Sequence, residues 1–411
     1  MSGVATRERV VATGIGVIAP TGAGTDEFWK ATRDGACAIG RMRRYEPDGY
    51  PLTLAGELTG FCPEQAIGAP IAVQTDRFTQ IALAVAELAL RDASFDPASA
   101  PPFQVGVVTA SCVGGAEFGQ RETEQLYQDG PRFVGPYQSI AWFYAASTGQ
   151  ISIRHGLRGP CGVLVTDEAG ALDAVAHARR DLRHGAGAML VGGAEAPVTP
   201  FAMACLYALR LLSTGTDPAT AYQPFTAAAN GFVPAEGGAM LLLESAAQAR
   251  ARGARAYAEI AGYGTTFTGA GRFDRSTEGL VRAARLALAE AGAEPDEVDV
   301  VFADALGTPA ADRAEAAALR ELFGSRATRV PVTAPKTGTG RAFAGAGAID
   351  VATAMLAIEQ AAVPPTPNVD EVAYDLDLVV GEARPVGVRT ALVWARGLSG
   401  SNSALVIRAT G

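Results

Sequence analysis

Short apolar runs that end in glycine or small polar residues alternate with helical stretches along the whole chain. Such runs predict buried strands, because a strand covered by helices on both faces need not alternate apolar and polar side chains. In the first half of the chain these runs are Val10–Gly16, Val105–Ala110, Val163–Asp167, Ala188–Gly193 and Ala239–Glu244. In the second half they are Tyr257–Gly264, Val298–Ala303, Val330–Ala334, Thr390–Ala395 and Ala404–Ala409.

Helical spacing fills the intervals between the predicted strands. Apolar residues recur at helical spacing from Phe78 to Ala89, with Thr75 or Asp76 as the expected N-cap, and again from Leu280 to Leu288. Each half therefore shows a similar series of strands with helices between them. The simplest interpretation is a duplicated α/β unit, with an N-terminal half at 1–248 and a C-terminal half at 249–411 packed as one body.

Composition narrows the class of protein. The 411 residues are 48% hydrophobic and 19% charged, which is typical of a folded globular chain, and the net charge of −9 argues against a nucleic-acid surface. The five cysteines are scattered without metal-ligand spacing, so we expect reduced thiols in the cytoplasm and no metal or other cofactor. The start lacks a signal-peptide pattern and no apolar run is long enough to span a membrane, so we expect no membrane association.

The first apolar run contains Gly14–Ala19, which formally matches the dinucleotide-binding fingerprint. Pro20 and Gly22 follow at once, so no helix can open there to hold a pyrophosphate. We therefore expect a strand that ends in a loop, and no nucleotide site.

Residues 162–177 predict a strand, a sharp turn and a helix, and the turn carries Glu168. A nucleophile is favoured at such a turn, because the helix N-terminus lowers its pKa and stabilises developing negative charge. A carboxylate at a helix start is also electrostatically favourable, so Glu168 can equally be a simple cap. The helix ends in a basic last turn followed by Gly185, so His177 and His184 are expected to be ordinary helix residues.

This turn resembles the active-site turn of the β-ketoacyl synthases, in which Cys stands in place of Glu168. Segments 224–244, 301–315, 331–347 and 397–406 extend the resemblance over nearly the whole chain. In that family two histidines stand where this chain has Asp304 and Arg341, whereas Lys336 and Glu315 are retained. The three histidines of this chain, His155, His177 and His184, all lie upstream of both positions.

Within that family the chain resembles the chain-length factor, the β subunit of type II polyketide ketosynthases; segments 141–156 and 391–397 are close to its pattern. That subunit commonly has Gln at the turn, where this chain has Glu168. The resemblance implies a thiolase-like, duplicated, five-layered α/β/α/β/α fold. It also implies pairing with an active ketosynthase α subunit as a heterodimer, and work with an acyl carrier protein that carries the polyketide on phosphopantetheine.

The residues at these three positions do not suit a condensation reaction. A Claisen condensation needs a thiolate to hold the acyl chain and neutral groups to assist decarboxylation and stabilise an enolate. Ionised Glu168 and Asp304 would repel an enolate, and Arg341 can pair with both. We therefore expect no catalytic residue here, and a buried polar or ionic cluster of Glu168, Asp304 and Arg341 in the old active site, with Arg341 paired to one or both carboxyl groups.

In the family that the chain resembles, residues on one helix close a tunnel at the subunit interface. Ala116, Gly119 and Thr123 occupy that stretch, share one helical face and are small. They predict a deep pocket and a long polyketide, unless they serve a close helix–helix contact instead. Val105–Ala110 and residues 142–144 are the candidates for the subunit interface. The alternative function is a decarboxylase of malonyl-acyl carrier protein that supplies the primer, although the histidines which that reaction needs are absent.

Overall fold

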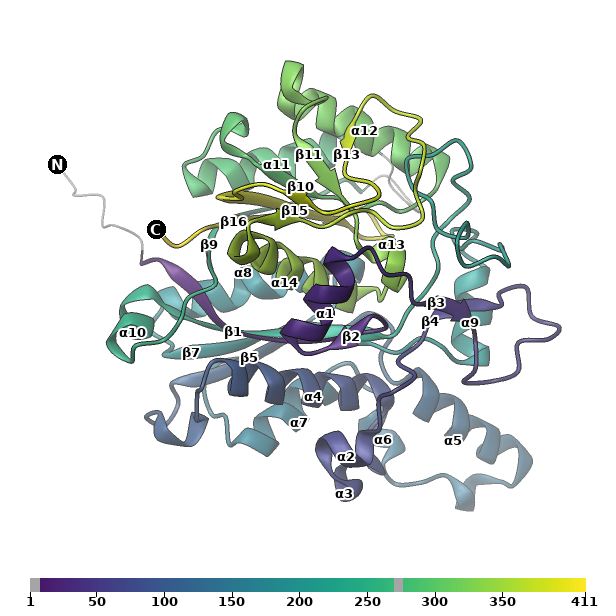
Figure 1. Cartoon of the computed structure of the whole chain (residues 1–411). Helices are drawn as coiled ribbons and strands as arrows, with labels where there is room; N and C mark the ends of the chain where they lie inside the picture. Colours follow the sequence, from purple (N-terminus) through teal and green to yellow (C-terminus); the bar gives the residue numbers. More distant parts are fainter. Residues whose placement is uncertain (1–7, 270–275) are drawn as a thin grey trace.

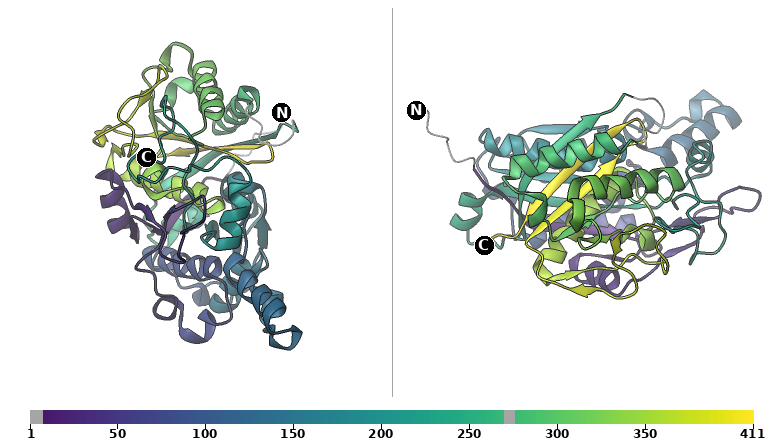
Figure 2. Two further views of the ribbon diagram at one scale, coloured as in Figure 1. Left: turned by 90° about the vertical axis from the view of Figure 1, so that its right-hand side faces the viewer. Right: turned by 90° about the horizontal axis from the view of Figure 1, so that it is seen from above.

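Two sheets lie between three layers of helices in the computed structural model, which describes residues 8–269 and 276–411 (Figure 1). The first sheet is covered on its outer face by α4 (Arg77–Asp92) and α7 (Ala146–His155). The middle layer contains α8 (Gly170–Arg183) and α14 (Ala344–Gln360), and the second outer layer contains α11 (Thr277–Ala291) and α12 (Pro309–Phe323). Viewed from above, α11 and α12 lie across the second sheet (Figure 2). The predicted α/β/α/β/α arrangement is therefore confirmed.

The strands of the two halves follow a related order. The first sheet runs β1 (Val10–Ala19), β8 (Gly237–Ser245), β7 (Ala188–Glu195), β5 (Val105–Ala110) and β6 (Cys161–Leu164). The second runs β9 (Ala258–Phe267), β16 (Ser401–Arg408), β15 (Thr390–Arg396), β10 (Val300–Phe302), β11 (Pro331–Thr333) and β13 (Asp377–Leu378). A short antiparallel pairing of β1 with β9 joins the two sheets.

Shorter elements connect or flank these layers. The helices among them are α1 (Thr25–Arg33), α2 (Pro63–Ile67), α3 (Ala69–Ala72), α6 (Gln138–Ala141), α9 (Pro200–Tyr207), α10 (Ala246–Ala251) and α13 (Lys336–Thr339). The short strands are β2 (Gly22–Ala23), β3 (Ile39–Arg41), β4 (Leu54–Gly56), β12 (Ala362–Val363) and β14 (Arg384–Pro385). The helix α5 (Ala116–Gln128) stands out from the layered body at one end (Figures 1 and 2).

Glycines in the two central strands allow the outer helices to pack closely. A Cβ on Gly16 of β1 would lie 2.0 Å from the carbonyl oxygen of Val85 on α4. A Cβ on Gly264 of β9 would lie 2.1 Å from the carbonyl oxygen of Ala283 on α11. The glycines of Gly14–Ala19 therefore serve helix–sheet packing, and β1 continues to its end at Ala19 without opening a helix.

One predicted strand needs correction. The strand predicted at Val163–Asp167 lies earlier, at Cys161–Leu164, because Asp167 has a φ of 51° that an extended strand cannot adopt. A 3-10 turn at Asp167–Ala169 follows, and α8 begins only at Gly170. Asp76, one of two expected caps, is the N-cap of α4.

The predicted interface strand also needs correction. Val105–Ala110 forms β5, which is buried between β6 and β7 and cannot present a surface. The strand at the edge of this sheet is β6. Across the residues that the structure describes, no helix is both long and apolar enough to cross a membrane.

Candidate functional site

The turn between β6 and α8 places Glu168 at the boundary between the first sheet and the middle helix layer. Asp167, just before it, holds its left-handed conformation while accepting hydrogen bonds from the backbone N–H and hydroxyl of Ser399. A strained turn fixed in this way aims the next side chain inward. Glu168 is accordingly 2% exposed.

Arg341 brings the three substituted positions together. Its Nε donates to Oε2 of Glu168 at 2.7 Å, and one terminal nitrogen contacts both that oxygen and Oδ1 of Asp304, the latter at 2.6 Å. The other terminal nitrogen donates to the backbone carbonyl of Asp304. All three side chains are buried. The expected cluster of Glu168, Asp304 and Arg341 therefore exists as one continuous set of charge-assisted hydrogen bonds.

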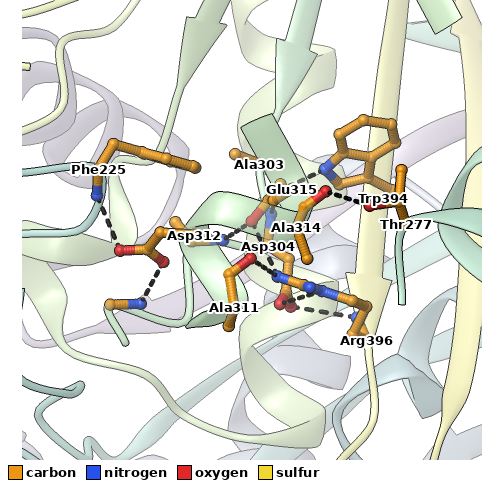
Figure 3. Close-up of polar contacts among 12 residues, drawn as sticks. Phe225, Thr277, Ala303, Asp304, Ala311, Asp312, Ala314, Glu315, Trp394 and Arg396 are labelled. Atoms are coloured by element: carbon orange, nitrogen blue, oxygen red, sulfur yellow. Dashed lines mark hydrogen bonds and ion pairs between the residues drawn. The ribbon is translucent and has the colours of Figure 1, made fainter. Parts of the chain in front are cut away.

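A second arginine, Arg396, also binds the carboxylate of Asp304, as Figure 3 shows. Nε of Arg396, at the end of β15, donates to Oδ2 of Asp304 at 3.1 Å, and its NH2 group donates to Glu315 at 3.1 Å. Glu315 also accepts the indole N–H of Trp394 at 2.7 Å and the backbone N–H groups of Asp304 and Ala305. Glu315 thus orders the backbone around Asp304 while Arg396 balances part of its charge.

Lys336 lies on the third side of the cluster. Its ammonium group donates to the backbone carbonyl of Ala303 at 2.7 Å and forms a buried ion pair with Asp350 on α14. It therefore supports the loop that carries Asp304 and does not face open space. Lys336 and Glu315, the retained residues of the resemblance, are both part of this packed interior.

The pKa values of the two carboxyl groups bound to Arg341 are shifted in opposite directions. Burial opposes ionisation of Asp304, but the guanidinium groups of Arg341 and Arg396 outweigh burial and hold its pKa well below the usual range. Burial raises the pKa of Glu168, and pairing with Arg341 does not fully offset it. Among the described residues, no group donates a hydrogen bond to Oε1 of Glu168.

The side chains at this turn differ from the thiol and imidazole groups that a condensing site uses. The turn offers a carboxyl group in place of a thiol, and the two positions at which the resembling family has histidines hold the carboxylate of Asp304 and the permanently charged guanidinium of Arg341. The histidines lie elsewhere: His155 ends α7, His177 lies within α8 and His184 is its C-cap. Within residues 8–269 and 276–411, no group of three or more potential ligands could hold a metal ion.

Sequence reasoning missed several members of the cluster. Arg396, Trp394 and Asp350 were not predicted as site residues, yet each contacts a predicted one or its supporting loop. A signal was present in the sequence, because Arg396 and Asp350 are charged residues set in otherwise apolar segments. Such residues are rarely buried unless they are paired.

A separate pocket lies under α5. It has a volume of about 670 Å3 and is lined by Ala116, Gly119 and Thr123 together with Trp142, Phe201 and Leu206. A Cβ on Gly119 would meet its nearest neighbours at 3.9 Å, an ordinary contact, so no close helix approach requires glycine there. The pocket is walled by α5, by the residues after α6, and by α9.

Comparison with known proteins finds similarity over nearly the whole chain. Residues 7–249 match the family described as Beta-ketoacyl synthase, N-terminal domain, and residues 257–370 match Beta-ketoacyl synthase, C-terminal domain. The tetracenomycin polyketide synthase ketoacyl synthase beta subunit of Streptomyces glaucescens is 51% identical over 406 residues, 98% of each chain.

Two solved structures resemble the fold closely. The ishigamide ketosynthase/chain length factor has a TM-score of 0.93 at 29% identity and covers 99% of this chain and 100% of its own. A type II PKS acyl-carrier protein in complex with its ketosynthase bound to the hexaketide has a TM-score of 0.89 at 29% identity, with 98% and 100% coverage.

Proposed function

The chain belongs to the beta-ketoacyl synthase family. We propose that it is a chain length factor of a type II polyketide synthase. In this role it pairs with an active ketosynthase, carries out no condensation itself and determines how long the polyketide grows. The observation that carries the proposal is the combination of a charge-filled catalytic position with an open pocket under α5.

The absence of catalysis follows from the residues at the turn. Glu168 cannot form a thioester with an acyl chain, and Arg341 already donates to both Glu168 and Asp304. An acyl group entering this position would have to displace buried ion pairs, which costs several kcal/mol, on the order of 3 to 5. The catalytic thiol must therefore come from the partner ketosynthase.

The end of the molecule around the pocket is suited to that partner. Trp142 and Phe201 line the pocket and are 47% and 66% exposed, and Ile140 and Phe143 beside Trp142 are also about half exposed. Large exposed apolar side chains of this kind mark protein interfaces. The edge strand β6 offers unpaired backbone groups as well.

The remaining partners follow from the chemistry. An acyl carrier protein would deliver extender units to the active ketosynthase, as in the solved complex that contains such a carrier. We place the complex in the cytoplasm, where the five free thiols of this chain would stay reduced.

Chain length is controlled by volume exclusion in the pocket. Ala116, Gly119 and Thr123 occupy its α5 wall with small side chains, so the pocket keeps room for a long chain. A larger side chain at these positions would fill space that the end of the polyketide needs. Small residues at this wall therefore support a long product.

The test is coexpression of this chain with an active ketosynthase and its acyl carrier protein, followed by size-exclusion chromatography and mass spectrometry of the products. We expect a heterodimer, and long polyketides only when this chain is present. Ala116→Phe should shift the products to shorter chains, because the ring of Phe occupies part of the pocket.

Gln128→Phe is the matched control, because Gln128 is exposed on the last turn of α5 and does not line the pocket. It should leave product length unchanged. Identical product lengths for Ala116→Phe and the unmodified chain would refute the pocket mechanism. Decarboxylation of malonyl thioester by this chain alone would refute the non-catalytic role.

A further inference from the structure

The helix that walls the pocket has no N-terminal cap of its own. The residue at the N-cap position of α5 is Gly115, which has no side chain to accept a hydrogen bond. The backbone N–H of Phe118, in the first turn, donates instead to Oδ2 of Asp76 at 2.7 Å. The N–H of Phe118, which has no partner within its own helix, is therefore satisfied by the N-cap residue of α4, more than forty positions away in sequence.

The same carboxylate also caps α4. Oδ1 of Asp76 accepts the backbone N–H of Phe78 at 3.0 Å, and Asp76 is 2% exposed. Its chain neighbour Arg77 forms two hydrogen bonds to Glu236, a residue with no exposed surface. Asp76 is thus fixed to the rigid layered body, and its second oxygen ties α5 to that body.

Among the other side-chain contacts of α5, two lead to the segments around the pocket, and a third, an ion pair of Glu117 with Arg44 at 2.6 Å, leads through Arg44 to Glu236 at 3.2 Å. Gln120 accepts the backbone N–H of Phe201 at 3.0 Å, and Glu122 accepts that of Gly135. These contacts hold α5 to the segments that form the other walls of the pocket. They would preserve the fold if the tie to Asp76 were lost. The link through Arg44 and Glu117 is partly exposed, with side chains 24% and 40% accessible, so solvent screens it and it holds the first turn of α5 less firmly than the buried carboxylate of Asp76 does.

We propose that Asp76 is a positioning residue for chain length, because it sets where the pocket wall stands relative to the body of the subunit. This inference rests on the proposed function. Phe118 lies between Ala116 and Gly119, so the hydrogen bond acts at the level of the residues that line the pocket. A shift of α5 by one residue along its axis would move these side chains by about 1.5 Å and change the pocket depth.

Asp76→Ser separates the two roles of the carboxylate. Serine is a good N-cap and can still accept from the first turn of α4, but its hydroxyl is too short to reach Phe118 on α5. We expect an intact heterodimer with total product within about twofold of the unmodified complex, since one cap contributes little to the whole fold. The fraction of products of other lengths should rise about fivefold, the population ratio that one lost helix cap corresponds to.

Hydrogen exchange provides the second readout on the same heterodimer. The amide of Phe118 should exchange faster in Asp76→Ser, and the amide of Phe78 should not change. Asp96→Ser is the matched control, because Asp96 accepts the backbone N–H of Ala98 at a 3-10 turn beyond the other end of α4. That variant should change neither exchange at Phe118 nor product length.

Faster exchange at Phe118 with an unchanged length distribution would overturn the inference, as would a fall in total product with no change in length ratio. If Asp76→Ser yields no heterodimer, the isosteric Asp76→Asn, which can accept only one of the two N–H groups, gives the same comparison. If Ala116→Phe shortens the products and the Asp76 variants do not, only this inference fails. If Ala116→Phe also has no effect, the proposed function fails.

Discussion

The buried cluster at Glu168 and the pocket under α5 show two different ways in which one fold can be adapted. At the cluster, side chains with the chemistry for catalysis are replaced by charges that satisfy one another and leave no space. At the pocket, the small side chains of Ala116, Gly119 and Thr123 leave space. The ion pairs of the cluster hold the interior together, whereas the small side chains under α5 leave a pocket at the surface. We therefore expect substitutions at the cluster to affect stability, and substitutions at the pocket to affect the product.

Arg341→Met should give the largest effect on stability. Methionine keeps much of the volume of the side chain but leaves Glu168 and Asp304 with less compensating charge in the interior. Removing one partner of a buried ion pair costs about 3 to 5 kcal/mol. Chemical denaturation of the heterodimer measures this loss.

Arg384→Met is the control for that experiment. Arg384 pairs with Asp377 at 2.6 Å, but the two side chains are 39% and 24% exposed. The loss should be below about 1 kcal/mol, because solvent screens such pairs. Equal losses for the two variants would mean that the buried cluster has no special role.

Two further variants, Asp304→Asn and Glu168→Gln, compare how much each carboxyl group of the cluster contributes to stability. The lowered pKa of Asp304 indicates that the arginines favour its charge, so its loss should cost about 3 to 5 kcal/mol. Glu168 has a raised pKa because of burial, so Glu168→Gln should cost only about 1 to 2 kcal/mol. Denaturation of the two variants under the same conditions gives the order.

The pH dependence of the same variants follows from the opposite pKa directions. A raised carboxyl pKa contributes stability that is present below the usual glutamate pKa and lost as pH rises through the folded-state value. In Glu168→Gln, the free energy of unfolding should therefore decrease less as the pH rises from the usual glutamate pKa to the raised pKa of Glu168. The contribution of Asp304 is lost only as pH falls through its lowered pKa, so Asp304→Asn should lower stability evenly at neutral pH. Identical pH profiles would contradict this assignment.

Gly119→Ala should give the smallest effect. The added Cβ meets its neighbours at 3.9 Å, and alanine favours a helix over glycine by about 0.5 to 1 kcal/mol. We expect a small gain in thermal stability and no large change in product length. Gly115→Ala is the contrasting variant, because a Cβ there would lie 2.2 Å from the carbonyl oxygen of Ala141 and should destabilise the protein.

The layers and the central cluster could be predicted because their signals lie in short segments. Buried strands such as β5 and β15 appear as apolar runs. Glu168 and Asp304 come a few residues after two other such runs, β6 and β10. These two strands lie in different sheets, and Arg341 joins the carboxyl groups that follow them. A resemblance to a known family then indicated which of these positions had lost their chemistry.

The remaining features depend on tertiary placement. The sequence of Val105–Ala110 is that of a strand, but only the sheet order shows that β6 lies outside it at the edge. Nothing near Gly115 in sequence indicates that its helix is capped by Asp76. Arg396 was visible as a charge in a buried strand, but its contact with Asp304 required the fold.

The shared pairing of Arg341 has a consequence for how this protein can evolve. Replacing Glu168 by Cys would leave a guanidinium group beside a thiol, and replacing Arg341 by His would release a buried carboxyl group from its partner. Replacing Asp304 by His would place an imidazole between two arginines. Each of these single changes leaves a buried charge without part of its partner, so we expect each to lower the stability of the fold. The three charged side chains therefore depend on one another, and the stability of the fold opposes changing any one of them alone.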